Sequence, residues 1–138
     1  MHDLLQIGGI TVPMRDRLKK AFTIHKLDDR NYPADTITHI ATNGHDGVPA
    51  DVMAALPNLQ MISCYGVGYD AIDTTSAAER GILVTHTPNV LNQEVATTTI
   101  LLLLAVYRNF LHDEAYARSG QWEAEGNAPL SRSVDGVT

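Results

Sequence analysis

The residue types and spacing best suited to chemistry occur in a glycine-containing turn at 66–68, which follows the apolar stretch 59–64. The stretch predicts a buried strand, and glycines directly after it allow a tight turn in which successive backbone N–H groups point into a concave surface. Val67 and Gly68 would then donate to a small anion such as a carboxylate. A strand-to-helix turn without any ligand explains the same residues equally well.

Residues 66–71 also satisfy the relaxed dinucleotide-binding pattern G-x-G-x-x-G/A. Three features argue against that interpretation. Asp70 would place a carboxylate beside the pyrophosphate, the next helix is expected to begin only at Asp73, and no acidic residue near position 86 is available to hold a ribose hydroxyl. The anion-binding interpretation is therefore preferred to a dinucleotide site, with Asp70 expected to cap or brace the loop.

The other candidate functional residues, cysteine and histidines, are supported by weaker sequence patterns. Cys64 ends the predicted strand without a cationic neighbour, which indicates an unreactive buried thiol. His86 lies at the end of a later strand and could reach a ligand, although a hydrogen-bonded structural role is the better interpretation. The other histidines lack the spacing and the third ligand of a metal site, so no metal is predicted.

Short apolar stretches alternate with amphipathic stretches along the first part of the chain. This alternation predicts an α/β domain with a largely parallel sheet and helices on both faces. Ligands bind at the carboxyl ends of the strands in such sheets. Asn43 and Gly44 follow the predicted strand at 37–42 and are therefore expected to line the same cleft as Val67 and Gly68.

A long helix is predicted from 92 to 118, because no residue in that range is a strong helix breaker. Its centre, 100–106, is apolar on all sides, which predicts burial among several neighbouring elements. Seven residues are too few for a membrane span, which needs about 20.

Charge, cysteine content and length restrict the binding partners, the cellular compartment and the number of domains that the sequence is compatible with. The chain has 138 residues and a formal net charge of -6, which opposes binding to nucleic acids and to anionic membranes. A single cysteine excludes an internal disulfide framework and favours a reducing, cytoplasmic location. A chain of this length holds one domain and not two full lobes.

The ordered motifs resemble those of one family, the D-isomer specific 2-hydroxyacid dehydrogenases, and in particular its glyoxylate, hydroxypyruvate and hydroxyphenylpyruvate reductases. The resemblance covers most of the chain, and the first 40 residues match only in pattern. His86 stands where the family usually has Asn, and Thr97 where an acidic residue is common. The matching segments are 56–59, 66–70, 72–73, 77–78, 81–84, 87–88, 94–96 and 120–122.

The resemblance implies a flavodoxin-like substrate lobe over 1–119 and, over 120–138, a hinge toward a Rossmann cofactor lobe absent from this chain. It further implies that the family's catalytic Arg, Glu and His lie after the equivalent of Thr138, so no catalytic residue is assigned here. Val67 and Gly68 would cradle the substrate carboxylate, and Val95 would face the nicotinamide. A homodimer is also implied.

The resemblance therefore implies part of an oxidoreductase that uses NAD or NADP to reduce a small 2-oxo acid, glyoxylate or hydroxypyruvate, to the D-2-hydroxy acid. The 138 residues alone are expected to be inactive, because they supply only the carboxylate cradle. Two alternatives stay open. One is a stand-alone module that binds small carboxylates without catalysis, and the other is a structural or dimerising fragment.

Overall fold

The computed structural model describes residues 2–29 and 31–136, which form two compact units. The division between the two units falls after Val90. The physical reason is that residues 91 onward form helices that pack among themselves and add no strand to the sheet of the first unit. The extent of each lobe in a full-length enzyme stays a prediction.

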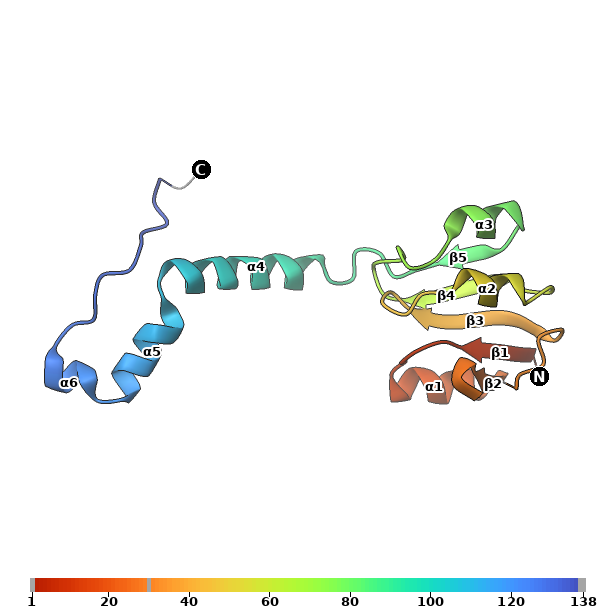
Figure 1. The fold of residues 1–138 in the computed structure, drawn as a ribbon, viewed down its shortest axis with the longest axis horizontal. Helices are drawn as coiled ribbons and strands as arrows, with labels where there is room; N and C mark the ends of the chain where they lie inside the picture. Colours follow the sequence, from red (N-terminus) through yellow and green to blue (C-terminus); the bar gives the residue numbers. More distant parts are fainter. Residues whose placement is uncertain (1, 30, 137–138) are drawn as a thin grey trace. The chain divides into compact units, whose positions relative to one another are not determined.

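The first unit is built on one parallel sheet of five strands (Figure 1). The order across the sheet is β2-β1-β3-β4-β5, which is the flavodoxin-like order, so the predicted fold class is confirmed. Since all strands are parallel, their carboxyl ends lie along one edge, with the reversal of order between β1 and β3. The strands are β1 (His2–Gln6), β2 (Phe22–Lys26), β3 (Ile37–Asn43), β4 (Met61–Tyr65) and β5 (Leu83–Thr85).

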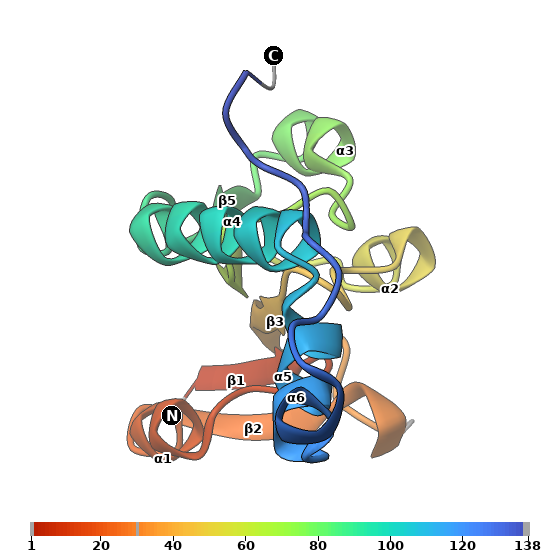
Figure 2. The same cartoon turned by 90° about the vertical axis from the view of Figure 1, so that its left-hand side faces the viewer.

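Helices cover both faces of this sheet, as the alternation predicted. They are α1 (Val12–Leu18), the 3-10 turn η1 (Leu27–Asp29), α2 (Ala50–Ala54) and α3 (Thr74–Glu79). Figure 2 shows α1 on one side of the sheet and α2 and α3 on the other. The chain moves one way across the sheet from β1 to β2 and the opposite way from β3 to β5, so right-handed crossovers place these helices on opposite faces.

The main apolar core is built from the three central strands and from α2. Leu5, Ile40 and Ile62 come from β1, β3 and β4, are at most 1% exposed, and belong to one cluster with Met53 and Leu56. Burial of large aliphatic side chains of this kind contributes about 1.5–3 kcal/mol each. The core therefore holds the strands in a fixed register, and with them the loops at the carboxyl edge.

Two polar side chains, one at each end, stabilise α3. Asp73 caps α3, because its Oδ1 accepts a hydrogen bond from the Ser76 N–H at 2.9 Å. At the other end of α3, the Arg80 guanidinium donates to the carbonyl oxygens of Met53 at 2.5 Å and Leu56 at 2.7 Å. The predicted start of this helix at Asp73 is confirmed.

The second unit contains α4 (Asn92–Tyr107), α5 (Phe110–Arg118) and α6 (Gln121–Glu125). The prediction of one helix over 92–118 is wrong, because Asn109 adopts a left-handed conformation with φ 49° and α4 and α5 are bent by 63° at this point. Asparagine enters this conformation more readily than other non-glycine residues, so neither proline nor glycine was needed to break the helix.

The expected burial of 100–106 is also wrong, since α4 has no buried residue. Leu101 is 63% exposed and Val106 is 78% exposed. A helix that is apolar on all sides needs neighbours on several sides, and besides α4 the described part of the second unit contains two short helices. In the described part of the chain, no single helix is long and apolar enough to cross a membrane; α4 and α5 pass that test only as a bent pair.

Candidate functional site

Two exposed residues in the turn after β4 carry the backbone N–H groups of the predicted site. Val67 is 38% exposed and Gly68 is exposed. Within residues 2–29 and 31–136, the N–H groups of Val67 and Gly68 donate no hydrogen bond to the protein. Two neighbouring amides without a partner at the carboxyl edge of a parallel sheet are suited to bind a small anion. That these amides bind a carboxylate stays a prediction.

The carbonyl groups of the same turn, in contrast, are held by the segment that follows β5. The Thr87 N–H donates to the Gly66 oxygen at 2.9 Å, and His86 Nδ1 lies 2.9 Å from the Val67 oxygen. The sequence favoured a hydrogen-bonded structural role for His86, and the structure confirms such a bond. The sequence did not predict that its partner is the glycine turn, because the two segments are 19 residues apart.

Cys64, the fourth residue of β4, is hydrogen-bonded to the turn. Its Sγ donates to the Gly68 oxygen at 3.4 Å, and the side chain is buried. Burial raises the pKa of the Cys64 thiol, since the charged thiolate loses its hydration in the interior. The burial that the sequence predicted for Cys64 is confirmed, and its thiol holds the loop through the Gly68 oxygen.

The glycines of the turn serve a different purpose from the one predicted. Neither Gly66 nor Gly68 has a positive φ, so the turn does not depend on the left-handed conformations that only glycine adopts easily. Instead, a Cβ atom at Gly44 would lie 2.6 Å from the Gly68 oxygen, and one at Gly66 would lie 3.2 Å from the Gly44 nitrogen. The glycines allow the loops after β3 and β4 to contact each other.

Asn43 organises the loop that contains Gly44. Its Nδ2 donates to the Gly9 oxygen at 3.0 Å and to Asp46 Oδ2 at 2.5 Å, and its Oδ1 accepts from the backbone N–H groups of His45 and Asp46. These four bonds use both donors and both lone pairs of the side-chain amide. The Asn43 side chain thus joins the loops after β1 and β3.

The structure brings four of the five predicted site residues to one edge of the sheet. Asn43 is the last residue of β3 and Gly44 follows it, while Val67 and Gly68 lie in the turn after β4. The fifth, Val95, is 60% exposed on the first turn of α4 in the second unit. In the described part of the chain, no three His, Cys, Asp or Glu residues are grouped so that they could hold a metal ion.

The turn does not form a dinucleotide site. In such a site the glycine turn opens directly into a helix whose N-terminus faces the pyrophosphate. Here the Ala71 oxygen accepts a hydrogen bond from the Val48 N–H at 3.1 Å, and the helix begins later, at Thr74. The turn at 66–71 therefore does not fit the pyrophosphate of a nicotinamide dinucleotide.

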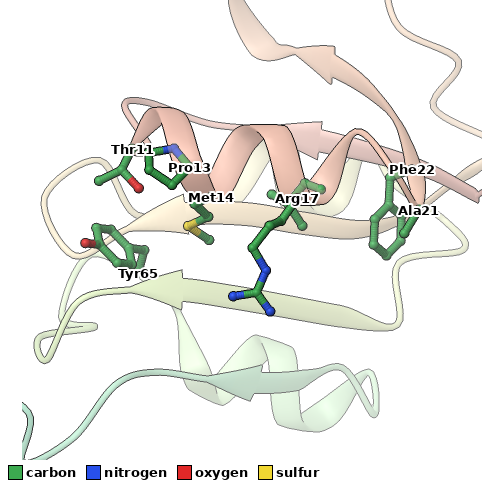
Figure 3. A pocket seen from close by; sticks show the side chains of 8 residues that line it. Thr11, Pro13, Met14, Arg17, Ala21, Phe22 and Tyr65 are labelled. Atoms are coloured by element: carbon green, nitrogen blue, oxygen red, sulfur yellow. The ribbon is translucent and has the colours of Figure 1, made fainter.

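A separate apolar groove of about 540 Å³ runs beside α1 on one face of the sheet (Figure 3). Met14 and Arg17 extend from α1 into the view, with Tyr65 at one end and Phe22 at the other. The groove follows the length of the strands, and its lining is mainly apolar. It lacks the converging polar groups that orient a small substrate.

Comparison with known proteins identifies the family. The family model for the D-isomer specific 2-hydroxyacid dehydrogenase catalytic domain matches residues 3–127. The chain belongs to this family. Among curated dehydrogenases, the 2-ketogluconate reductase of Gluconobacter oxydans is 40% identical over 135 residues, a match that covers 96% of this chain and 43% of the reductase. The glyoxylate reductase of Thermofilum pendens is 49% identical over 82 residues, covering 59% of this chain and 24% of that enzyme.

Solved dehydrogenase structures have the same fold. A 2-hydroxyacid dehydrogenase from Ketogulonicigenium vulgare superposes with a TM-score of 0.87 at 41% identity, covering 99% of this chain and 46% of that one. The NADPH-dependent glyoxylate/hydroxypyruvate reductase from Sinorhizobium meliloti, in complex with NADP and malonate, superposes with a TM-score of 0.82 at 36% identity. This match covers 100% of this chain and 45% of the reductase. The chain thus spans less than half the length of these dehydrogenases.

Proposed function

We propose that this chain is the substrate-binding part of an oxidoreductase that reduces a small 2-oxo acid, glyoxylate or hydroxypyruvate, to the D-2-hydroxy acid with NADH or NADPH. The observation that carries the proposal is the pair of N–H groups of Val67 and Gly68 at the carboxyl edge of the sheet, which have no hydrogen-bond acceptor among residues 2–29 and 31–136. The names of the related glyoxylate and hydroxypyruvate reductases support the substrate class.

The two amides would bind the carboxylate that all 2-oxo acids share. Hydrogen bonds from N–H groups to an ionised oxygen are shorter and about twice as strong as those between neutral groups. A carboxylate held by its two oxygens leaves the adjacent 2-oxo carbon in a defined position. Asn43 and Gly44 would bound the cleft from the loop after β3, Gly44 through its backbone and Asn43 by holding the loop.

The cofactor of the proposed reaction is NAD or NADP, whose nicotinamide would supply the hydride when bound. Because the glycine turn does not fit the pyrophosphate and the chain spans less than half the length of the related dehydrogenases, we propose that the cofactor is bound mainly by residues outside this chain, with Val95 as one contact to the nicotinamide. The catalytic Arg, Glu and His of the family are likewise proposed to lie in the part of the enzyme that this chain does not span.

The proposed assembly is a homodimer in the cytoplasm. The exposed apolar surface of α4 supports association, because apolar patches of this kind are covered in stable proteins. The single cysteine, buried and reduced, is compatible with a reducing compartment. The net charge of -6 disfavours nucleic acid and anionic membranes as partners.

Titration of the isotope-labelled chain with glyoxylate tests the carboxylate site. We expect the amide resonances of Val67 and Gly68 to shift with a dissociation constant in the millimolar range, about -4 kcal/mol, because two amides make few contacts. Glycolaldehyde, which has the carbonyl but not the carboxylate, is the control and should cause no shift. If other amides respond to glyoxylate while these two stay unchanged, the site assignment is wrong.

An activity assay distinguishes the dehydrogenase from the stand-alone binding module. The 138-residue chain and a full-length enzyme containing it are each mixed with NADPH or NADH and glyoxylate or hydroxypyruvate. Only the full-length enzyme should oxidise the cofactor, since carbonyl polarisation and proton transfer each lower the barrier by several kcal/mol. Turnover by the 138 residues alone would contradict the proposal. Carboxylate binding without turnover in either protein would favour the binding module.

A further inference from the structure

We infer that His86 is a positioning residue for the substrate carboxylate, because it fixes the orientation of the peptide unit that carries the Gly68 N–H. The inference rests on the proposed carboxylate site. Its first observation is the 2.9 Å distance between His86 Nδ1 and the Val67 oxygen. A carbonyl oxygen only accepts hydrogen bonds, so Nδ1 must carry the hydrogen, and in the neutral ring Nε2 carries none.

The consequence follows from the planarity of the peptide bond. The C=O of Val67 and the N–H of Gly68 belong to one peptide unit, and in a trans peptide these two groups point in opposite directions. The described backbone contains no cis peptide bond. When His86 holds the Val67 oxygen, it therefore directs the Gly68 N–H away from the His86 side chain.

The neighbouring peptide unit is held in the same way. The Thr87 N–H donates to the Gly66 oxygen at 2.9 Å, which directs the Val67 N–H away from Thr87. Two consecutive residues after β5 thus fix the two consecutive peptide units whose N–H groups form the proposed cradle. Donors that are oriented before binding bind a ligand more tightly, because no ordering of the loop opposes the binding.

The imidazole itself is held in place. Its ring contacts that of Tyr69 edge to face, with centroids 4.7 Å apart and an interplanar angle of 69°, and His86 is half-buried. Such contacts between rings favour one orientation of each. His86 thus makes two interactions, the hydrogen bond to the Val67 oxygen and the ring contact with Tyr69, and two substitutions can remove them one at a time. His86→Phe keeps an aromatic ring beside Tyr69 without a donor, and His86→Asn keeps an amide donor without the ring.

A first experiment tests the orientation without any ligand. The nitrogen resonances of the neutral imidazole should show a hydrogen on Nδ1 and none on Nε2, and the Gly68 amide resonance should move in H86F and return toward its original position in H86N. Urea unfolding of each variant measures stability separately. A hydrogen on Nε2, or a Gly68 amide that is the same in H86F and in the unmutated chain, would overturn the inference whatever the ligand result.

A second experiment tests the consequence for binding, with glyoxylate as the probe. We expect glyoxylate to bind about three- to tenfold more weakly to H86F, the range that corresponds to one hydrogen bond, and close to normally to H86N. Equal affinities for H86F and the unmutated chain would overturn the inference while leaving the carboxylate site intact. If the unmutated chain does not bind glyoxylate at all, the proposed function fails, and the role of His86 in substrate binding fails with it.

Discussion

The backbone of Gly44 lies so close to the carbonyl group of Gly68 that a Cβ atom at position 44 would stand 2.6 Å from the Gly68 oxygen. This contact joins the loop after β3 to the glycine turn after β4. Since the Gly68 oxygen belongs to backbone and is also held by Cys64, it cannot move aside as a flexible side chain would. The close approach of these two loops defines the shape of the proposed cleft.

We therefore expect Gly44→Ala to lower the free energy of unfolding by about 1–3 kcal/mol, the usual cost of forcing extra volume into a packed site. The variant should also weaken glyoxylate binding, because the turn must shift to make room. Urea unfolding and the amide titration measure the two effects. Gly9→Ala is the matched control, since a Cβ atom at position 9 meets no atom within 4 Å. If Gly44→Ala and Gly9→Ala lower the free energy of unfolding by the same amount, the close approach of Gly44 to the Gly68 oxygen is contradicted.

Arg80 should be important for stability although it belongs to no ion pair in the described structure. Its guanidinium donates to the carbonyl oxygens of Met53 and Leu56 at the end of α2. Hydrogen bonds of a charged donor are worth about 1.5–3 kcal/mol, so Arg80→Ala should lower the free energy of unfolding by an amount in that range. Arg17→Ala is the control, because the structure shows no hydrogen bond or ion pair of the Arg17 side chain among the described residues, and its backbone carbonyl, which accepts from the Lys20 N–H, is kept in the variant. A loss no larger than that of Arg17→Ala would show that the two bonds contribute nothing.

Asp73 should make stability depend on pH in the acid range. Its hydrogen bonds with the side chain and the backbone N–H of Ser76 hold the pKa of the Asp73 carboxyl below its ordinary value. A lowered pKa means that the stabilising effect is present above the unfolded pKa and is lost as the pH falls through the folded pKa. The free energy of unfolding should therefore decrease as the pH drops below about 4, the ordinary range for Asp.

Asp73→Asn provides the comparison, since asparagine caps a helix as well as aspartate but does not titrate. Urea unfolding across the acid range should show a shallower decrease for D73N than for the unmutated chain. Other titrating carboxyl groups, Asp3 among them, are present in both proteins and cancel in the difference. Parallel curves for the two proteins would mean that the cap does not perturb the titration of Asp73.

The apolar surface of α4 should cause self-association in solution. Leu101, at 63% exposure, is expected to take part, so Leu101→Glu should lower the apparent mass measured by light scattering over a concentration series. Leu83→Glu is the control, because Leu83 is 58% exposed but belongs to the first unit. A folded chain that stays monomeric at every concentration would contradict the proposed homodimer.

Local features of this chain could be predicted from the sequence. The start of α3 at Asp73 depends on a hydrogen bond to Ser76, three residues away, so it is determined by neighbours along the chain. The strands followed from short apolar stretches, and their alternation with helices indicated a parallel sheet. The exception is Asn109, whose left-handed backbone divides the predicted long helix, because asparagine adopts either conformation at little cost.

Only the tertiary structure decided which groups meet at the carboxyl edge. The sequence indicated that Val67 and Gly68 could donate to an anion, but not that His86 and Thr87 hold the carbonyl groups of that turn or that Gly44 is packed against it. These contacts join loops after β3, β4 and β5. They form because the sheet places those strands side by side in a register fixed by the buried core, and this order is not encoded in any local pattern of residues.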